Sequence, residues 1–171
     1  MGGPGENLIE TARLILEPIG SSHADGILEA TNASRRELLP WMPWARETTA
    51  EGIAEEAATG GTAFAIIEKS TAQLLGVVGL NPGEDGSQEL HYWIRTDHAG
   101  QGLTTEAGRG LLDWARRTQG ITKFTLWAGR ENLASRRVAE KLGFVHVGPL
   151  GWRPEGGLGQ FDAESYELNL T

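Results

Sequence analysis

The amino-acid sequence predicts a mixed α/β (α+β) fold, and three observations lead to that prediction. Some segments alternate apolar and polar residues, as half-buried strands do, and others repeat apolar residues every three or four positions, as amphipathic helices do. Glycine-rich turns separate the segments. Their order is strand, helix, helix, three strands, helix, strand, helix and two strands, which differs from a regular βαβ repeat.

The first half of the chain is expected to contain one strand, two helices and three further strands. Residues 13–17 (R-L-I-L-E) alternate as a first strand, and Ser21 and Ser22 are suited to cap a short helix that reaches residue 30. Thr48 and Glu51 have the spacing of a capping box and predict a second helix toward residue 58. The strand-like runs that follow predict a meander over residues 64–68, 74–80 and 89–94.

The second half of the chain alternates helices and strands. One apolar stripe predicts a helix through about residue 117, and its members are Leu103, Ala107, Leu111 and Trp114. The other expected elements are a strand over 123–128, a helix over 132–142 and closing strands over 145–147 and 165–170.

Composition narrows the class of protein. The 171 residues are 39% hydrophobic and 22% charged, which suits one domain over residues 1–171 with a loose start at 1–9. The formal charge of -8 disfavours nucleic acid as a partner, because phosphate neutralisation needs a basic face. The absence of cysteine excludes disulfides, thiolate zinc sites and an acyl-cysteine intermediate. No long apolar run or secretory signal is seen, so we expect a cytoplasmic protein with no membrane partner.

The segment D-H-A-G-Q-G-L-T-T-E at residues 97–106 has the composition of a phosphate-binding loop. Glycines at a helix start let a phosphate approach backbone N–H groups that have no intrahelical partner. A P-loop requires a lysine after its second glycine, and a dinucleotide loop requires Gly or Ala where Thr105 stands and an acid about twenty residues on. The segment fits neither, and a simple turn between strand and helix is the remaining alternative.

Longer motifs around this segment favour a third kind of phosphate site. N-L-A-S-R-R-V-A-E-K-L-G-F at 132–144, E-L-H-Y-W-I at 89–94 and G-Q-G-L-T-T-E-A at 100–107 together resemble the GNAT acetyltransferases. The resemblance is closest to their branch similar to RimJ and RimL, the ribosomal-protein N-terminal acetyltransferases, and covers about residues 10–170. It implies a GNAT fold, with a mixed, mostly antiparallel sheet of about six to seven strands and about four helices.

The resemblance implies that the phosphate is the pyrophosphate of acetyl-CoA, with coenzyme A as the product. In this family the strand backbone, here around Trp93 to Arg95, takes the pantetheine and the acetyl oxygen. Asp97 departs from the family pattern, which has Gln or Arg there, so binding would rest on the backbone and on Thr104 or Thr105. The expected coenzyme-binding residues are Trp93, Ile94, Arg95, Gly100, Gln101, Gly102, Leu103, Thr104, Thr105, Asn132 and Ser135.

Acetyl transfer to an amine requires a neutral nucleophile, a donor for the oxyanion and a proton for the departing thiolate. About a tenth of an α-amine is neutral at neutral pH, against less than about one part in a thousand of a lysine amine, so a weak base or a water chain suffices for the former. Glu89 is the first candidate base, because it leads into the glycine motif and shares a strand face with His91. His91 is the second candidate. The alternative for Glu89 is a solvated acid at a strand edge, and the alternative for His91 is a structural histidine.

By resemblance, the general acid lies on the helix that ends in G-F. Many GNAT members have a Tyr four residues before the terminal glycine, where this chain has Ala139. Ser135 lies four residues earlier, on the same helix face, and its hydroxyl is the candidate acid, as is proposed for the RimL-like branch. Asn132 would cap this helix or bond the pantetheine amide. An idle helix serine is the alternative for Ser135.

Aromatic residues predict the acceptor side of the site. Trp41, Met42 and Trp44 lie in a loop between the first two helices, where the family builds its acceptor wall. Aromatic walls suit peptides, planar rings and cationic amines, and core packing is the alternative for either tryptophan. Trp152 is expected in a long loop between the closing strands. The expected substrate-binding residues are Trp41, Met42, Trp44, Glu89, His91 and Trp152.

The other tryptophans and the histidines are expected to be structural. Trp114 and Trp127 are expected in the core. His23, His98 and His146 have no metal-ligand spacing, so no metal is expected.

The sequence therefore predicts an acetyl-CoA-dependent N-acetyltransferase that works by direct attack in a ternary complex. Its acceptor is a primary amine, either of a small molecule such as a metabolite or an antibiotic, or at a protein or peptide N-terminus. The contrasting hypothesis is a regulatory or partner-binding module that binds acyl-CoA without turnover. A homodimer is compatible with the exposed strand edges of this fold.

Overall fold

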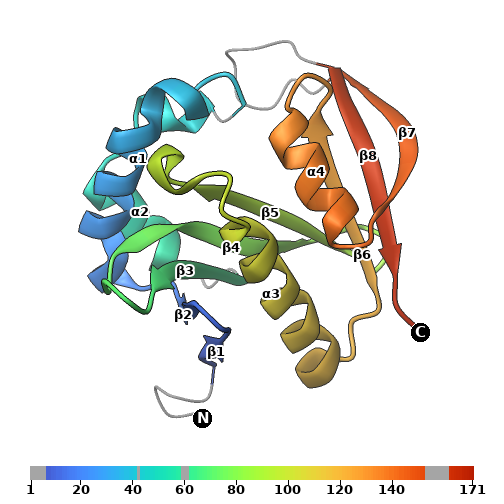
Figure 1. The fold of residues 1–171 in the computed structure, drawn as a ribbon, viewed down its shortest axis with the longest axis horizontal. Coiled ribbons are helices and arrows are strands. Elements are labelled where there is room, and N and C mark those ends of the chain that lie inside the picture. The colour runs from blue at the N-terminus through green and yellow to red at the C-terminus, as the bar shows by residue number, and fades with distance from the viewer. Residues whose placement is uncertain (1–6, 42, 59–61, 153–161) are drawn as a thin grey trace.

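The computed structural model describes residues 7–41, 43–58, 62–152 and 162–171 (Figure 1). Within them the chain forms one sheet of eight strands and four α-helices. The strands are β1 (Ile9–Glu10), β2 (Leu14–Pro18), β3 (Thr62–Glu68), β4 (Leu74–Pro82), β5 (Gln88–Ile94), β6 (Lys123–Gly129), β7 (Val145–Trp152) and β8 (Asp162–Asn169). The helices are α1 (Ala24–Leu38), α2 (Ala50–Ala58), α3 (Leu103–Gln119) and α4 (Leu133–Lys141). This is the mixed, mostly antiparallel architecture that the resemblance implies.

The strands are ordered β1-β2-β3-β4-β5-β6-β8-β7 across the sheet. β2 to β5 form an antiparallel meander, and β8 pairs antiparallel with both β6 and β7. Among the described residues, the pair between β5 and β6 alone is parallel. It is parallel because α3 carries the chain from the end of β5 back to the start of β6.

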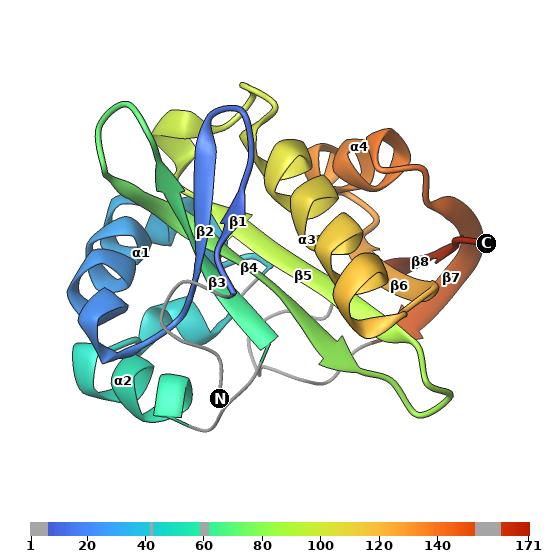
Figure 2. The same ribbon diagram turned by 90° about the horizontal axis from the view of Figure 1, so that it is seen from below.

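Helices cover both faces of the sheet, α1 and α2 on one face and α3 and α4 on the other (Figure 2). Between the sheet and α1 and α2, Ile27 and Ile53 are buried in one cluster with Trp93. A larger cluster lies under α3 and α4 and contains the predicted stripe of α3, with Leu111 fully buried and Trp114 half-buried against Phe64. The apolar period of α3 therefore marks its buried face, as the sequence predicts.

The two faces of β5 carry different functional candidates. Trp93 packs in the cluster under α1 and α2, whereas Leu90 and Tyr92 pack in the cluster under α3 and α4. Successive side chains of a strand point to opposite faces, so Glu89 and His91 lie on the face of Trp93. Tyr92 lies on the opposite face, toward α4.

The structure corrects the predicted start and end of α1. The helix extends to Leu38 rather than to residue 30, because small polar residues continue its buried face; Thr31 and Ser34 are fully buried there. The Thr31 hydroxyl donates to the Ile27 carbonyl at 2.8 Å, which satisfies it inside the helix. Ser21 does not cap α1, because a short 3-10 helix, Ser21–His23, precedes it. Buried hydroxyls gave no apolar signal in the sequence.

Two further boundaries differ from the prediction. The helix α2 begins at Ala50, and the Thr49 hydroxyl accepts a hydrogen bond from the Gly52 N–H at 3.1 Å, so Thr49 caps its start. The sheet has one strand more than the seven expected runs, because the two-residue β1 is too short to show a period. None of the helices in the described ranges is long and apolar enough to cross a membrane.

Candidate active site

The parallel strands β5 and β6 separate soon after they meet. Their ladder contains two pairs within the described residues, Gln88 with Phe124 and Glu89 with Thr125, and the strands then diverge (Figure 1). The Arg95 N–H donates to the Leu75 carbonyl of β4 at 2.7 Å. Along a strand, the backbone N–H and C=O groups of successive residues point alternately to one neighbouring strand and to the other. The backbone groups of Tyr92 and Ile94 therefore point away from β4, toward the opening between β5 and β6. Of the expected coenzyme-binding range Trp93 to Arg95, only Ile94 has backbone N–H and C=O groups that point toward this opening. The backbone groups of Tyr92, outside that range, point the same way.

The glycine motif lies at the start of α3. Gly100 and Gly102 have φ of +78° and +77°, in the left-handed region that glycine favours. The first intrahelical bond runs from the Glu106 N–H to the Gly102 carbonyl at 3.0 Å, so the N–H groups of the three preceding residues have no intrahelical acceptor. Gly102 is the N-cap residue and brings no side chain to cap them. This uncapped helix start is suited to an anion.

The two threonines of the motif differ in exposure. Thr105 is buried, with 8% of its surface exposed, whereas Thr104 is half-buried. Gln101 and both glycines are exposed. Thr104 is therefore the better placed of the two hydroxyls to reach a ligand on the helix start.

Arg13 brings a cation to this loop from the start of the chain. Its Nη1 donates to the Gln101 carbonyl at 3.0 Å, and its Nε donates to Glu106 Oε1 at 3.1 Å. The Thr11 hydroxyl donates to the other oxygen of Glu106 at 3.0 Å. A Cβ placed on Gly102 would lie 3.6 Å from Arg13 Nη2. Arg13 could not be predicted from the sequence, because no spacing pattern connects the residue before β2 with the glycines before α3.

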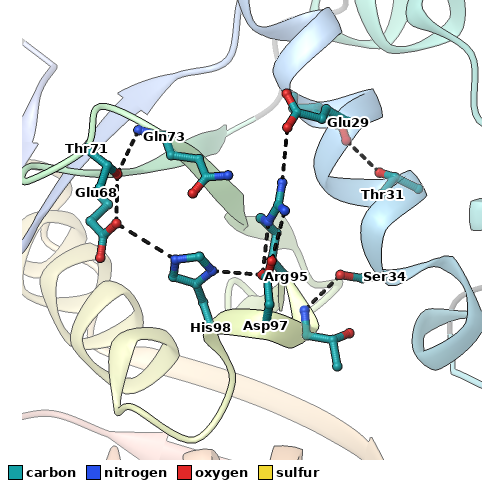
Figure 3. Close-up of polar contacts among 11 residues, drawn as sticks. Glu29, Thr31, Ser34, Glu68, Thr71, Gln73, Arg95, Asp97 and His98 are labelled. Carbon is teal, nitrogen blue, oxygen red and sulfur yellow. Dashed lines mark hydrogen bonds and ion pairs between the residues drawn. The ribbon is translucent and has the colours of Figure 1, made fainter.

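Asp97, before the glycine motif, is paired with neighbouring basic side chains. It accepts two hydrogen bonds from Arg95, from Nε and Nη2 at 3.0 Å each, and its Oδ1 lies 2.8 Å from His98 Nδ1 (Figure 3). The Arg95 guanidinium holds the pKa of Asp97 well below its usual range. Arg95 is buried and also pairs with Glu29 of α1 at 3.5 Å. Asp97 therefore neutralises a buried cation, which explains an acid at this position.

Further contacts tie the same loop to its surroundings (Figure 3). The Thr96 N–H donates to the Ser34 hydroxyl of α1 at 2.8 Å. His98 Nε2 lies 3.8 Å from Glu68 Oε2 at the end of β3. The connection from β5 to the glycines is thus held by α1 on one side and by β3 on the other.

The acid candidate Ser135 is held from two directions. Asn132 is the N-cap of α4, and its Oδ1 accepts from the Ser135 N–H at 3.2 Å. The Tyr92 hydroxyl lies 3.0 Å from the Ser135 carbonyl oxygen and 3.0 Å from Ser135 Oγ. Burial raises the pKa of Tyr92 to about 12, although the hydrogen bond with Ser135 opposes the rise. Tyr92 was missed from the sequence, because the alternation of β5 puts it on the face opposite His91 but does not tell which helix covers that face.

The two base candidates reach in different directions from β5. Glu89 Oε1 accepts a hydrogen bond from Trp127 Nε1 of β6 at 3.2 Å, so its carboxylate spans the point where the strands separate. His91 lies against Gly79 of β4, where a Cβ would stand 2.5 Å from Nε2. Burial lowers the pKa of His91, so the imidazole is neutral at neutral pH. Trp127 was expected to be a core residue, but it is half-buried and its indole N–H binds Glu89.

The acceptor side is described in part. Trp41 is half-buried beyond the end of α1, and Trp44 lies in a short 3-10 helix, Pro43–Arg46. Met42 lies outside the described residues. Trp152 is the last residue of β7, not part of a loop as predicted, because β7 pairs with β8 up to Asp162. Within the described residues, no group of three or more His, Asp or Glu is arranged to hold a metal ion.

Comparison with known proteins gives the family. The sequence model of the acetyltransferase (GNAT) domain matches residues 13–145. The N-acetyltransferase YjdG of Bacillus subtilis is 25% identical over 153 residues, which cover 81% of this chain and 89% of YjdG.

Two solved structures show the same fold. RimL, an α-N-acetyltransferase of ribosomal protein L7/L12 solved with coenzyme A, superposes with a TM-score of 0.82 and 20% identity, over 96% of this chain and 98% of RimL. MccE, a microcin C7 self-immunity acetyltransferase solved with acetyl-CoA and AMP, has a TM-score of 0.82 and 16% identity, over 94% of each chain. With the family model spanning most of the chain and its glycine motif, the protein belongs to the GNAT acetyltransferase family and is an N-acetyltransferase.

Proposed function

We propose that this protein transfers an acetyl group from acetyl-CoA to a primary amine by direct attack in a ternary complex. The observation that carries the proposal is the separation of β5 from β6 beyond Glu89, beside the uncapped start of α3. Hydroxyl groups flank this opening on one face of the sheet, and a carboxylate and an imidazole flank it on the other. We also propose that residues 1–171 form a single domain, since one sheet joins β1 to β8.

Groups of the protein along this opening match the parts of the coenzyme that they would bind. The N–H groups at the start of α3 and the side chain of Arg13 would hold the pyrophosphate. The outward backbone groups of Tyr92 and Ile94 would pair with the amides of the pantetheine arm. Asn132 already serves as the N-cap of α4, so we assign it to helix capping rather than to the pantetheine.

Acetyl-CoA supplies the thioester whose carbonyl carbon the amine attacks and whose sulfur leaves. Glu89 would take the proton that the amine nitrogen loses, and the position of its carboxylate where β5 and β6 separate supports this role. The Ser135 hydroxyl holds a proton for the departing sulfur. Exchange with solvent restores both groups, so one proton is lost and one is gained in each turnover. His91 is a candidate base because its imidazole is neutral. It ranks second because its ring lies against Gly79 of β4.

The acceptor is a primary amine of a small molecule or of a peptide N-terminus. Among the similar proteins, RimL is named as an α-N-acetyltransferase of a ribosomal protein, and MccE is named for self-immunity to microcin C7. On this chain, Trp41 and Trp44 precede α2 on the face that carries Glu89, and we assign them to the acceptor wall. The -8 charge favours a cationic amine of either kind.

The test follows free thiol release from acetyl-CoA with a panel of amines. The panel contains peptides with free N-termini, the same peptides with blocked N-termini, amino acids and aminated antibiotics. Saturable thiol release with at least one primary amine is expected, and mass spectrometry of the product gives a gain of one acetyl group. Release with peptides that disappears on blocking identifies an N-terminal acceptor, and release with small amines alone identifies a small molecule. Tight coenzyme binding without thiol release for any amine would favour the binding module instead.

A further inference from the structure

The two tyrosines of this chain both anchor α4 to the sheet through their hydroxyl groups. Tyr92 of β5 lies 3.0 Å from both Oγ and the carbonyl oxygen of Ser135. Tyr166 of β8 accepts from Arg136 Nε at 2.9 Å. The neighbouring residues Ser135 and Arg136 are thus held by different strands, and only one of the two anchors touches the candidate acid.

The direction of the Tyr92 O–H bond determines where the hydroxyl proton of Ser135 can point. A phenol has one O–H donor, and a serine hydroxyl has one donor and two acceptor positions. If Tyr92 donates to the carbonyl of Ser135, the Ser135 proton can turn back to the phenol oxygen. If Tyr92 donates to Ser135 Oγ, the Ser135 proton is directed elsewhere. Switching between the two needs only rotation of the two O–H bonds, because both acceptors lie 3.0 Å from the Tyr92 hydroxyl.

We propose that Tyr92 is a positioning residue that acts through Ser135, by donating to its Oγ and so directing the serine proton toward the leaving sulfur. This rests on the proposed function of Ser135. A hydrogen bond received at Oγ strengthens the same hydroxyl as a donor, because linked hydrogen bonds polarise one another. Tyr92 keeps its own proton throughout, and the sulfur receives the proton of Ser135, which solvent then replaces.

The raised pKa of Tyr92 agrees with a donor that does not ionise. A phenol with a pKa of about 12 stays protonated at any pH at which the enzyme would work. Its role therefore differs from that of a Tyr acid on the last helix, the position that Ala139 occupies here; Ala139 is fully buried.

A double-mutant cycle tests the proposal with the full chain. Tyr92→Phe should lower kcat about tenfold with little change in the KM for acetyl-CoA, since a lost hydrogen bond in the site contributes about that factor. Ser135→Ala should lower kcat at least as much. In the Ser135→Ala background, Tyr92→Phe should have no further effect beyond about twofold, because its target is gone. Equal losses in both backgrounds would overturn the proposal.

Tyr166→Phe is the matched control. It removes the other tyrosine anchor of α4 and keeps the ring, without touching Ser135. Its kcat should stay within about twofold of the parent value. A tenfold loss here as well would mean that anchoring of α4, and not the direction of the Ser135 proton, explains Tyr92.

A second readout needs no acceptor and no turnover. Coenzyme A is bound to each variant, and the thiol is titrated by its thiolate absorbance. The Ser135 hydroxyl should stabilise the bound thiolate, so the thiol pKa should rise in Tyr92→Phe and in Ser135→Ala, with no further rise in the double variant. If Ser135→Ala changes neither kcat nor this pKa, the acid assignment itself fails, and Tyr92 with it. If Ser135→Ala changes them and Tyr92→Phe does not, only the role of Tyr92 fails.

Discussion

At the scale of single residues, the two candidate bases differ in what holds them. Glu89 is bound across the strand opening by the indole of Trp127, whereas His91 rests on Gly79. A Cβ on Gly79 would stand 2.5 Å from His91 Nε2, so the absence of a side chain at this glycine leaves the space for the imidazole. These contacts support our proposal that Glu89 takes the proton and that His91 has a packing role.

Substitution of each residue by Gln separates these roles. Glu89→Gln keeps an oxygen for Trp127 but loses the basic carboxylate, so kcat/KM should fall about a hundredfold. His91→Gln should retain activity within about fivefold. The measurement is thiol release at saturating acetyl-CoA with a substrate from the amine panel. A larger loss for His91→Gln than for Glu89→Gln would reverse the assignment.

His91 also predicts how stability depends on pH. Burial lowers its pKa in the folded chain from the usual 6.5, so the unfolded state binds the proton more readily. Its contribution is present above pH 6.5 and is lost as the pH falls through the folded pKa. The free energy of unfolding, measured by urea titration, should therefore fall less on acidification in His91→Gln than in the parent chain. Equal slopes for the two proteins would contradict the lowered pKa, and the other histidines cancel in the comparison.

Asp97 offers a stability test of the loop before the glycines. Asp97→Asn removes the carboxylate that pairs with the buried Arg95, and should cost about 1 kcal/mol, a value reduced because Asp97 is itself half exposed. It should also weaken coenzyme binding, since the loop leads into Gly100. Asp85→Asn is the control, because Asp85 has the same 56% side-chain exposure but pairs with Lys123, which is 42% exposed. Chemical denaturation should show a smaller loss for Asp85→Asn.

At the scale of elements, the short β1–β2 hairpin and α3 form one unit. Thr11 and Arg13 hold Glu106 of α3, and Arg13 also holds the loop at Gln101. A carboxylate in the first turn of α3 would by itself repel a phosphate, and Arg13 offsets that charge. In the proposed phosphate site, the hairpin thus supplies a cation and the start of α3 supplies the backbone N–H groups.

Arg13→Ala should therefore weaken coenzyme A binding about three- to tenfold, since a half-exposed cation contributes about 1 kcal/mol to such contacts. Arg13→Lys should recover part of the affinity, because an ammonium keeps the charge but not the fork. The affinity is measured by isothermal titration calorimetry. Arg109→Ala is the control on the same helix, where Arg109 donates to the Lys141 carbonyl at 3.0 Å away from the glycines. Equal losses for Arg13→Ala and Arg109→Ala would remove Arg13 from the phosphate site.

At the scale of the whole molecule, the site joins parts from across the sequence. Groups from the β1–β2 hairpin, β5, α3 and α4 are assigned to the proposed coenzyme site, and β5 and β6 share two ladder pairs within the described residues. A ligand that bonds to the free edge of β5 and to the start of α3 would connect both parts of the sheet. The molecule should gain stability from its coenzyme beyond what the phosphate alone provides.

Differential scanning calorimetry measures this gain. At one hundred times its Kd, coenzyme A should add about 2.7 kcal/mol and raise Tm by about 5–10 °C for a chain of this size. ADP at the same multiple of its own Kd should give the same free energy, but it should need a far higher concentration, because it lacks the pantetheine arm. Equal Kd values for ADP and coenzyme A would contradict a role of the β5 edge in binding.

The far edge of the sheet bears on the expected homodimer. Val145 and Val147 of β7 are 68% and 57% exposed. The pairing of β7 with β8 shifts register at two places, after His146 and after Pro149, and such irregularities hinder edge-to-edge pairing. The homodimer therefore stays a prediction.

The sequence by itself determined the order of the elements and the kind of site. Period-two and period-3.6 patterns located β2 to β6 and the buried stripe of α3, because those elements bury one apolar face each. The glycines before α3 by themselves left a turn or a phosphate loop open, and it was the resemblance carried by the motif from Asn132 onward that implied a coenzyme site. The family match agrees with that reading.

Only the tertiary structure decided which side chains meet. Arg13 lies 88 positions from Gln101, and Tyr92 lies 43 positions from Ser135, and no local pattern encodes such pairs. Asp97 looked misplaced in the sequence because its partner, the buried Arg95, is defined by packing against α1 and not by spacing. Hydrogen bonds and ion pairs depend on distances of about 3 Å, and folding alone brings distant residues that close.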